Sequence, residues 1–180
     1  YIVAADQDGI MVFDQHAAHE RILYEALLAA LLNKQPASQT MIFPATLHLS
    51  LQEAQIMEDF LEDFQAMGFG IRSLGGRSFA VDALPACIDG IDATALILDC
   101  LHELAQDTPA RSLTKRQEAL AALVACKTRA IKAGKPLTGD QMRYLIEQLG
   151  NQENPHVCPH GRPTYFKITQ KEIERRLKRT

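Results

Sequence analysis

The amino-acid sequence predicts an α+β fold, in which a small mixed sheet with helices carries an inserted α-β-β-α subdomain. Three observations lead to this prediction. The chain opens on two apolar runs typical of a β-hairpin, long segments with apolar residues at helical spacing follow, and short strand-like runs lie between them. The 180 residues suffice for one domain or two small subdomains. A hydrophobic content of 47% argues against disorder.

The first part of the chain is predicted to form a hairpin followed by a helix. Apolar runs over 1–4 and 9–13 are separated by a turn that contains Asp8-Gly9, a sequence typical of hairpins. Asp14 follows the second strand and can cap the next helix. That helix is expected over 16–32, because its apolar residues recur at helical spacing.

The middle of the chain is predicted to alternate strands and helices. A helix over 51–67 is expected to bury an apolar face that includes Leu51 and to expose an acidic face that includes Asp63. Gly68 is expected to end this helix, and Gly75-Gly76 to form the turn of a second hairpin. The other elements expected here are strands over 41–43 and 46–49, interrupted by Pro44, strands over 69–73 and 78–81, and a helix over 93–106.

The last part of the chain is predicted to be mainly helical. Thr138 and Thr169 are suited to cap two of its helices. The expected elements are helices over 114–132, 138–149 and 169–178, a polar loop over 150–162 and a strand over 164–168.

Two candidate boundaries, near 46 and 108, divide the chain. The outer pieces, 1–46 plus 108–180, carry every candidate metal ligand and are predicted to form one discontinuous subdomain. The segment 47–107 is predicted to be an inserted, external subdomain with a regulatory role.

The bulk composition narrows the class of protein. A net charge of −3 argues against non-specific nucleic-acid binding, although Lys and Arg residues cluster near the C-terminus. Cys87 and Cys100 lie among apolar residues and are expected to be buried. No membrane span or signal peptide is visible, and the chain opens on a strand pattern without Met. We therefore interpret it as a fragment of a longer cytoplasmic protein.

Three distant segments offer the donor atoms of a metal site. His16 and Glu20 are four residues apart on a predicted helix and share a face, and Asp14 lies just before that helix. Zinc accepts thiolate, imidazole and carboxylate together, usually with four ligands. More donors are present than one tetrahedral ion needs, so either two ions share Glu20 or one ion has supporting groups around it. The remaining candidate ligands are Cys126, Cys158 and His160.

The spacing alone leaves other interpretations open. Cys126 lies in an apolar helical stretch, where a cysteine is usually part of the core. Taken alone, His16 could be a surface histidine near a helix N-terminus, and Glu20 could be an ordinary solvated helix position. The alternatives are a catalytic metal site, a zinc site that only stabilises the fold, and a metal-independent interaction domain.

Three motifs in series resemble those of the MutL mismatch-repair family. The segment that runs from Asp14 through His16 and Glu20 to Glu25 resembles the endonuclease motif of that family. The second and third motifs are Ala125-Cys126-Lys127 with Ala130-Ile131-Lys132-Ala133, and Cys158-Pro159-His160-Gly161-Arg162-Pro163.

The resemblance implies the C-terminal domain of a bacterial MutL of the nicking type. Such a domain homodimerises, holds regulatory zinc and catalytic manganese, and nicks duplex DNA. It implies a cytoplasmic protein that joins the nucleoid during repair and meets the mismatch-recognition protein through the full-length chain, with ATP bound only by an N-terminal domain outside this sequence. The residues that match the metal-site positions are Asp14, His16, Glu20, Cys126, Cys158 and His160.

A further segment resembles the short motif by which such domains bind the replicative sliding clamp. Gln39, Ile42 and Pro44 match it, and an extended apolar peptide with a fixed proline can dock in a groove. Phe166-Lys167-Ile168 has isoleucine where the family's C-terminal element has arginine, so no role is assigned to it.

The predicted reaction is metal-dependent hydrolysis of a phosphodiester. Asp14 and Glu20 are the predicted catalytic residues, because their hard oxygen donors suit manganese. His16, His160 and the two candidate cysteines suit zinc better. Lys127 and Arg162 lie beside candidate ligands and could contact phosphate, although either could equally be ordinary surface charge. The alternative is a non-catalytic, zinc-stabilised module for dimerisation and partner binding.

Overall fold

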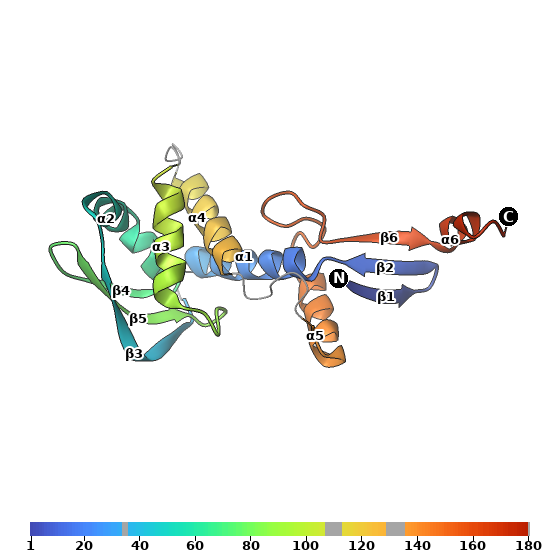
Figure 1. Ribbon diagram of the computed structural model, residues 1–180, viewed down its shortest axis with the longest axis horizontal. Helices are drawn as coiled ribbons and strands as arrows, with labels where there is room; N and C mark the ends of the chain where they lie inside the picture. The colour runs from blue at the N-terminus through green and yellow to red at the C-terminus, as the bar shows by residue number, and fades with distance from the viewer. Residues whose placement is uncertain (34–35, 107–112, 129–135, 180) are drawn as a thin grey trace. The chain divides into compact units, whose positions relative to one another are not determined.

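The computed structural model describes residues 1–33, 36–106, 113–128 and 136–179 and contains two compact units. Unit 1 comprises Tyr1–Ile22 and Ile131–Thr180, and unit 2 comprises Leu23–Ala130. Helices and two antiparallel three-stranded sheets confirm the α+β class (Figure 1). The elements are β1 (Ile2–Asp6), β2 (Gly9–Phe13), α1 (Gln15–Asn33), β3 (Ser38–His48), α2 (Leu51–Ala66), β4 (Gly70–Gly75), β5 (Ser78–Pro85), α3 (Ala93–Leu104), α4 (Leu113–Lys127), α5 (Gly139–Gly150), β6 (Tyr165–Thr169) and α6 (Gln170–Arg176).

The compact units divide the chain after residues 22 and 130. These positions differ from the boundaries near 46 and 108 that the sequence predicts, because α1 begins in unit 1 and continues in unit 2. The predicted division into a metal-site subdomain and a regulatory insertion concerns function and stays a prediction.

Unit 1 is built on the sheet β1-β2-β6. The predicted hairpin is confirmed, with Ile2 opposite Phe13, and β6 pairs antiparallel with β2 so that Phe13 faces Tyr165 (Figure 1). Gly9 lies in the tight turn with φ 144°, where a Cβ atom would collide with the carbonyl oxygen of Ile168. This position therefore needs glycine, which allows β6 to lie close to the start of β2.

The two faces of this sheet differ in what covers them. Side chains alternate between the faces along each strand, and paired residues lie on the same side. The face with Ile2 and Phe13 packs on Leu145 and Leu149 of α5. The other face, here called the outer sheet face, is apolar and includes Val3, which is 63% exposed, and Phe166, which is 55% exposed. Its members are Val3, Ala5, Ile10, Val12, Phe166 and Ile168.

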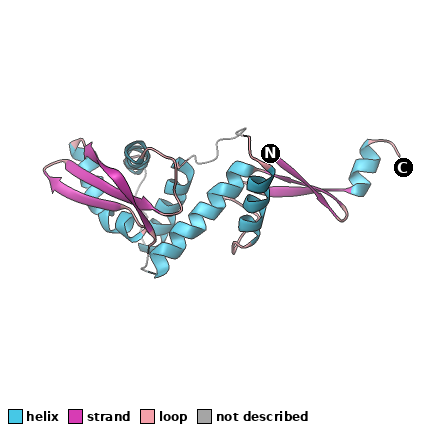
Figure 2. Cartoon of the chain, turned by 90° about the horizontal axis from the view of Figure 1, so that it is seen from below, coloured by secondary structure: helices cyan, strands magenta, loops and turns pink. Residues whose placement is uncertain are grey.

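Unit 2 is built on the sheet β3-β5-β4, against which α2 and α3 pack (Figure 2). Ser50 begins α2 with a capping box: its hydroxyl accepts from the Glu53 amide, and the Glu53 carboxylate accepts from the Ser50 amide. The core of this unit includes the buried rings of Phe64 and Phe79. It is closed by α4, which lies against α3.

The structure corrects four expectations in unit 2. Leu51 is 77% exposed, because it occupies the first position of α2 beside the cap. Asp63 is buried, because the Nε of Arg116 lies 3.0 Å from its Oδ2 and the Gln117 amide donates to its Oδ1. Cys87 is exposed in the turn after β5. The two short strands expected around Pro44 form the single strand β3, with a register shift between Thr40 and Ala45.

The predicted caps of α5 and α6 are confirmed, since Thr138 and Thr169 each accept a hydrogen bond from the backbone of their helix. The predicted extension of α4 to residue 132 lies outside the described residues. Among the helices that the structure describes, none has the combination of length and apolar character that a bilayer crossing requires.

Candidate metal centre

Asp14 lies where strand β2 gives way to helix α1, and its cap role is confirmed. Its Oδ1 accepts hydrogen bonds from the backbone amides of His16 (2.9 Å) and Ala17 (3.1 Å). Its own amide donates to the carbonyl of Thr164 (2.8 Å), just before β6. The carboxylate is therefore fixed at the positive end of the α1 dipole, in the corner between two strands and a helix.

His16 and Glu20 share one face of α1, as their spacing predicts. His16 Nε2 lies 3.1 Å from Glu20 Oε1. The His16 side chain is 29% exposed, whereas the Glu20 side chain is only 4% exposed. The imidazole therefore lies on the solvent side of a buried carboxylate.

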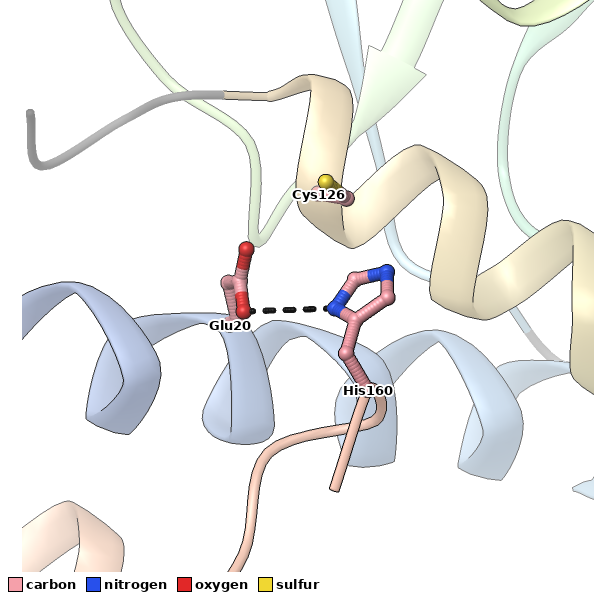
Figure 3. A group of neighbouring side chains, drawn as sticks. All are labelled: Glu20, Cys126 and His160. Atoms are coloured by element: carbon pink, nitrogen blue, oxygen red, sulfur yellow. Dashed lines mark ion pairs between the residues drawn. The ribbon is translucent and has the colours of Figure 1, made fainter. Parts of the chain in front are cut away.

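His160 approaches the same carboxylate from a loop far along the chain. The loop is a tight turn in which Gly161 N donates to Cys158 O (2.9 Å) and Cys158 N donates to Arg162 O (2.8 Å). His160 Nδ1 lies 3.5 Å from Glu20 Oε2, as the dashed line in Figure 3 shows. Glu20 thus has an imidazole beside each of its two oxygens.

Arg21 holds this loop against the helix. Its Nε donates a 2.6 Å hydrogen bond to the carbonyl of Val157, and its side chain is buried. Sequence reasoning did not single out Arg21. The sequence does hold a signal for it, because Arg21 directly follows Glu20 and precedes the apolar part of α1. An arginine in such a position becomes buried and then needs hydrogen-bond acceptors at a fixed place.

The negative charge of the Glu20 carboxylate is incompletely compensated. Glu20 Oε2 is buried and accepts no hydrogen bond from the described residues, although His160 lies close by. A buried carboxylate without full pairing costs on the order of several kcal/mol, so this position favours a cation. Burial lowers the pKa of the neighbouring His19 to about 4, with a further lowering by the charge of His16, so His19 is a neutral ring at pH 7. The donor set of Glu20 with two imidazoles fits a divalent metal ion.

The other predicted site residues lie in different settings. The Cys158 thiol is buried, at the start of the loop that carries His160. Cys126 belongs to unit 2, where it is partly buried in the last turn of α4; it is also labelled in Figure 3, and its role as a ligand stays a prediction. Arg162 is exposed. Lys127 is engaged by Glu103 at 2.8 Å, a hydrogen bond that raises the pKa of the lysine, and phosphate contacts by either cation stay predictions.

Residues 130–133 of the second motif lie outside the described part of the chain. Gln39, Ile42 and Pro44 are exposed on β3 in unit 2.

Comparison with known proteins decides the family. A family model described as the MutL C terminal dimerisation domain matches residues 1–137. The chain belongs to this family. Its resemblance to the MutL family, drawn from three motifs, is thereby confirmed. Proteins named DNA mismatch repair protein MutL are 36% identical to the chain over 175 residues in Chelativorans sp. (strain BNC1) and 34% identical over 181 residues in Chlorobaculum tepidum. The alignments cover 97% and 100% of this chain, which spans 28% of the length of each of these MutL relatives.

The contact between Arg21 and Val157 can be tested without any metal. Arg21→Met keeps an aliphatic side chain and removes the donor. We expect the amides of Cys158 and Gly161 to exchange with solvent deuterium about 10-fold faster, because a charge-assisted hydrogen bond contributes about 1.5 kcal/mol or more. Arg143→Met, at an exposed position of α5, is the control and should leave both amides unchanged. Equal exchange in the wild type and Arg21→Met would show that this contact does not hold the loop.

Proposed function

We propose that this chain is the metal-dependent nicking endonuclease domain of a bacterial DNA mismatch-repair protein. The observation that carries the proposal is the buried Glu20 carboxylate, which has an imidazole beside each oxygen. Asp14, fixed at the strand-helix junction of the same helix, supplies the second carboxylate of the proposal. The family membership and the mismatch-repair names of the relatives support it. The substrate is a phosphodiester of duplex DNA, and the reaction is hydrolysis.

The residues divide by the kind of cation that each would hold. Asp14 and Glu20 offer hard oxygen donors that suit Mn²⁺. His16 and His160, with the thiols of Cys126 and Cys158, suit a regulatory Zn²⁺. A bound divalent cation supplies Lewis acidity and lowers the pKa of coordinated water.

The contribution of the chain itself is orientation. Asp14 Oδ1 is fixed by two amides of α1, and Oδ2 accepts no hydrogen bond from the described residues, so it remains available for a ligand role. Glu20 is shielded from water by its burial, which strengthens its electrostatic interactions. His16 and His160 keep the carboxylate oriented from both sides. A phosphate that reaches this corner would meet a preorganised set of ligands.

A second candidate function is a non-catalytic module in which zinc only stabilises the fold. The buried Cys158 thiol favours it, since a thiolate and two imidazoles are typical of structural zinc sites. The same residues serve both functions, so zinc content does not separate them. Manganese-dependent nicking does.

Homodimerisation is part of the proposal, as the name of the family model suggests. The outer sheet face presents apolar side chains from all three strands, with no charged residue among its strand positions. Val3 and Phe166 are exposed large apolar side chains on this face. Such a continuous apolar face on a small unit is typical of a protein interface, and a second copy would cover it with the same residues.

Binding to the replicative sliding clamp would place the domain on DNA. Ile42 is 89% exposed and Phe43 is 83% exposed, because β3 leaves its register with β5 between Thr40 and Ala45. The segment 41–44 is therefore an excursion from the sheet. An extended segment with two exposed apolar side chains and a proline can dock in a groove of a partner.

The relatives are much longer than this chain, so the full-length protein is proposed to contain further domains. We propose a cytoplasmic repair protein in which another domain binds ATP and meets the mismatch-recognition protein. With a net charge of −3, the isolated chain should bind DNA weakly and nick it slowly.

The nicking proposal can be tested with a single carboxylate. We expect the wild-type chain, in excess and with Mn²⁺, to nick supercoiled plasmid slowly. Asp14→Asn should lower the rate on the order of 100-fold or more, because asparagine keeps the helix cap but removes the charge that holds a cation. The measurement is the conversion of supercoiled to open-circular plasmid.

A control variant and a zinc measurement complete this experiment. Asp140→Asn, at an exposed position in the first turn of α5, should nick like the wild type. Cys158→Ser should lower the zinc content measured by elemental analysis. Zinc without nicking in the wild type would favour the non-catalytic module, and Asp14→Asn with full activity would remove Asp14 from the mechanism.

The dimer interface can be tested by placing charge on the outer sheet face. We expect Val3→Asp with Phe166→Asp to raise the dimer dissociation constant by about 100-fold or more, because each interface would bury unpaired carboxylates. Light scattering coupled to size exclusion measures the mass. Leu32→Asp with Leu51→Asp, two exposed positions in unit 2, is the control and should stay dimeric. Dissociation of both variants alike would show that this face is not the interface.

The clamp segment can be tested by truncating its exposed side chains. We expect Ile42→Ala with Phe43→Ala to weaken binding to the purified sliding clamp by about 10-fold or more, because each apolar side chain contributes on the order of 1 kcal/mol or more when it is buried. Binding is measured by surface plasmon resonance. Leu74→Ala, at an exposed position of β4, is the matched control. Unchanged clamp affinity in the double variant would place the clamp contact elsewhere.

A further inference from the structure

We propose that a cationic segment at the end of the chain binds the phosphate backbone of duplex DNA. The segment consists of Lys171 and Arg175 on α6 and of Lys178 and Arg179 in the turn that follows. The proposal rests on the proposed function only in taking duplex DNA as the polyanion. It gives that function a substrate-binding surface outside the metal centre.

The charge of the chain is strongly segregated. Residues 165–180 contain six Lys and Arg residues and two Glu residues, whereas the rest of the chain contains thirteen Lys and Arg residues and twenty Asp and Glu residues. The C-terminal segment is therefore net positive on a net negative molecule. A polyanion is repelled by most of the surface and attracted to this part of it.

The four cations of the segment are free to bind a ligand. Two other cations nearby are already paired: Lys167 with Asp6 at 2.6 Å, and Arg176 with Glu172 at 2.9 Å. The remaining cations are exposed, and none forms an ion pair or a side-chain hydrogen bond with the described residues. They are Lys171, Arg175, Lys178 and Arg179.

Local helix stability does not account for this pattern. Arg175 lies in the last turn of α6, where a cation interacts favourably with the helix dipole. Lys171 is the second residue of the same helix, where a cation is unfavourable. Lys178 adopts φ 55°, a left-handed conformation that glycine normally occupies after a helix, so a lysine there costs conformational energy. Two of the four cations are therefore present despite a local cost.

The backbone fixes the last two cations rather than leaving them on a loose end. Lys178 N donates to Arg175 O (3.2 Å), and Arg179 N donates to Glu174 O (3.0 Å). With Lys178 in the left-handed region, these bonds form a Schellman motif. The cations are thus partly preorganised, which lowers the entropy that a phosphate contact must overcome.

The position of the segment within unit 1 suits a duplex that also reaches the metal centre. Strand β6 begins beside the Asp14 corner, where Tyr165 faces Phe13, and ends at Thr169, the cap of α6 (Figure 1). Five residues of strand span roughly 17 Å. That is the length of about five base pairs, so one DNA molecule can contact both places.

The experiment compares two triple variants with the same net charge. The first, Lys171→Gln with Arg175→Gln and Lys178→Gln, neutralises the segment. The matched control, Arg72→Gln with Arg77→Gln and Arg143→Gln, neutralises exposed cations elsewhere. Binding of the 180-residue chain to a labelled duplex of about 30 base pairs is measured by fluorescence anisotropy in a chelator, from about 50 to about 200 mM salt.

We expect the first variant to raise the dissociation constant by about 10-fold or more at low salt. The slope of the logarithm of the binding constant against the logarithm of the salt concentration should become smaller in magnitude by about 1 for each DNA phosphate that the variant no longer neutralises. The control should change the dissociation constant by about 2-fold at most, through net charge alone. Lys171→Arg with Lys178→Arg should bind like the wild type. Circular dichroism establishes that every variant is folded.

Three results would overturn the proposal: equal weakening in the two triple variants, an unchanged salt slope, or weaker binding to polyglutamate together with unchanged binding to DNA. The last result would assign the segment to an acidic protein. Because the chelator prevents metal-dependent cleavage, the outcome is independent of nicking. If the chain binds DNA as expected but does not nick it, only the proposed function is contradicted. If the chain nicks DNA but the first triple variant binds it like the control, only the proposed role of the cationic segment is contradicted.

Discussion

The electrostatic position of Glu20 is the constraint around which unit 1 is organised. A carboxylate that is almost wholly removed from water needs compensating partners, and α1 supplies one of them, His16. The second, His160, comes from a loop that the chain reaches only after α5. The loop is held in place by Arg21, which neighbours Glu20 on the helix. One turn of α1 therefore supplies Glu20, the carboxylate that needs partners, and Arg21, which holds the loop that carries His160.

The sheet of unit 1 makes this corner possible. The pairing of β2 with β6 brings Thr164 beside Asp14, and the resulting hydrogen bond joins the start of α1 to the end of the His160 loop. Gly9, which has no Cβ atom, lets the Ile168 carbonyl of β6 come close to the backbone of β2. One face of the sheet packs on α5, and the other is the apolar outer sheet face. The same five-residue strands thus serve the core, the metal centre and the proposed dimer interface.

The proposed functions rest on different sets of residues. The metal centre lies at one end of β6, and the cationic segment that follows Thr169 lies at the other. The exposed excursion of β3 belongs to unit 2. Each function can therefore be tested by substituting residues that the others do not use.

Much of the local structure followed from the sequence, because its causes are local. Turn residues, helical spacing and caps predicted both hairpins and most of the helices, and Asp14 was recognised as a cap. The amphipathic pattern was less reliable about individual residues. It placed Asp63 on an exposed face, although Arg116 from another helix makes its burial favourable. It also counted Leu51 among the core residues, although the position beside the cap is exposed.

The sequence by itself determined that His16 and Glu20 face the same way, since a helix places residues four apart on one side. It also determined the family, through three motifs in order. Only the tertiary structure decided that Glu20 is buried, that His160 lies beside its second oxygen, and that Arg21 holds the loop between them. These facts depend on contacts between residues more than a hundred positions apart, and no local spacing encodes which distant segment will supply a partner.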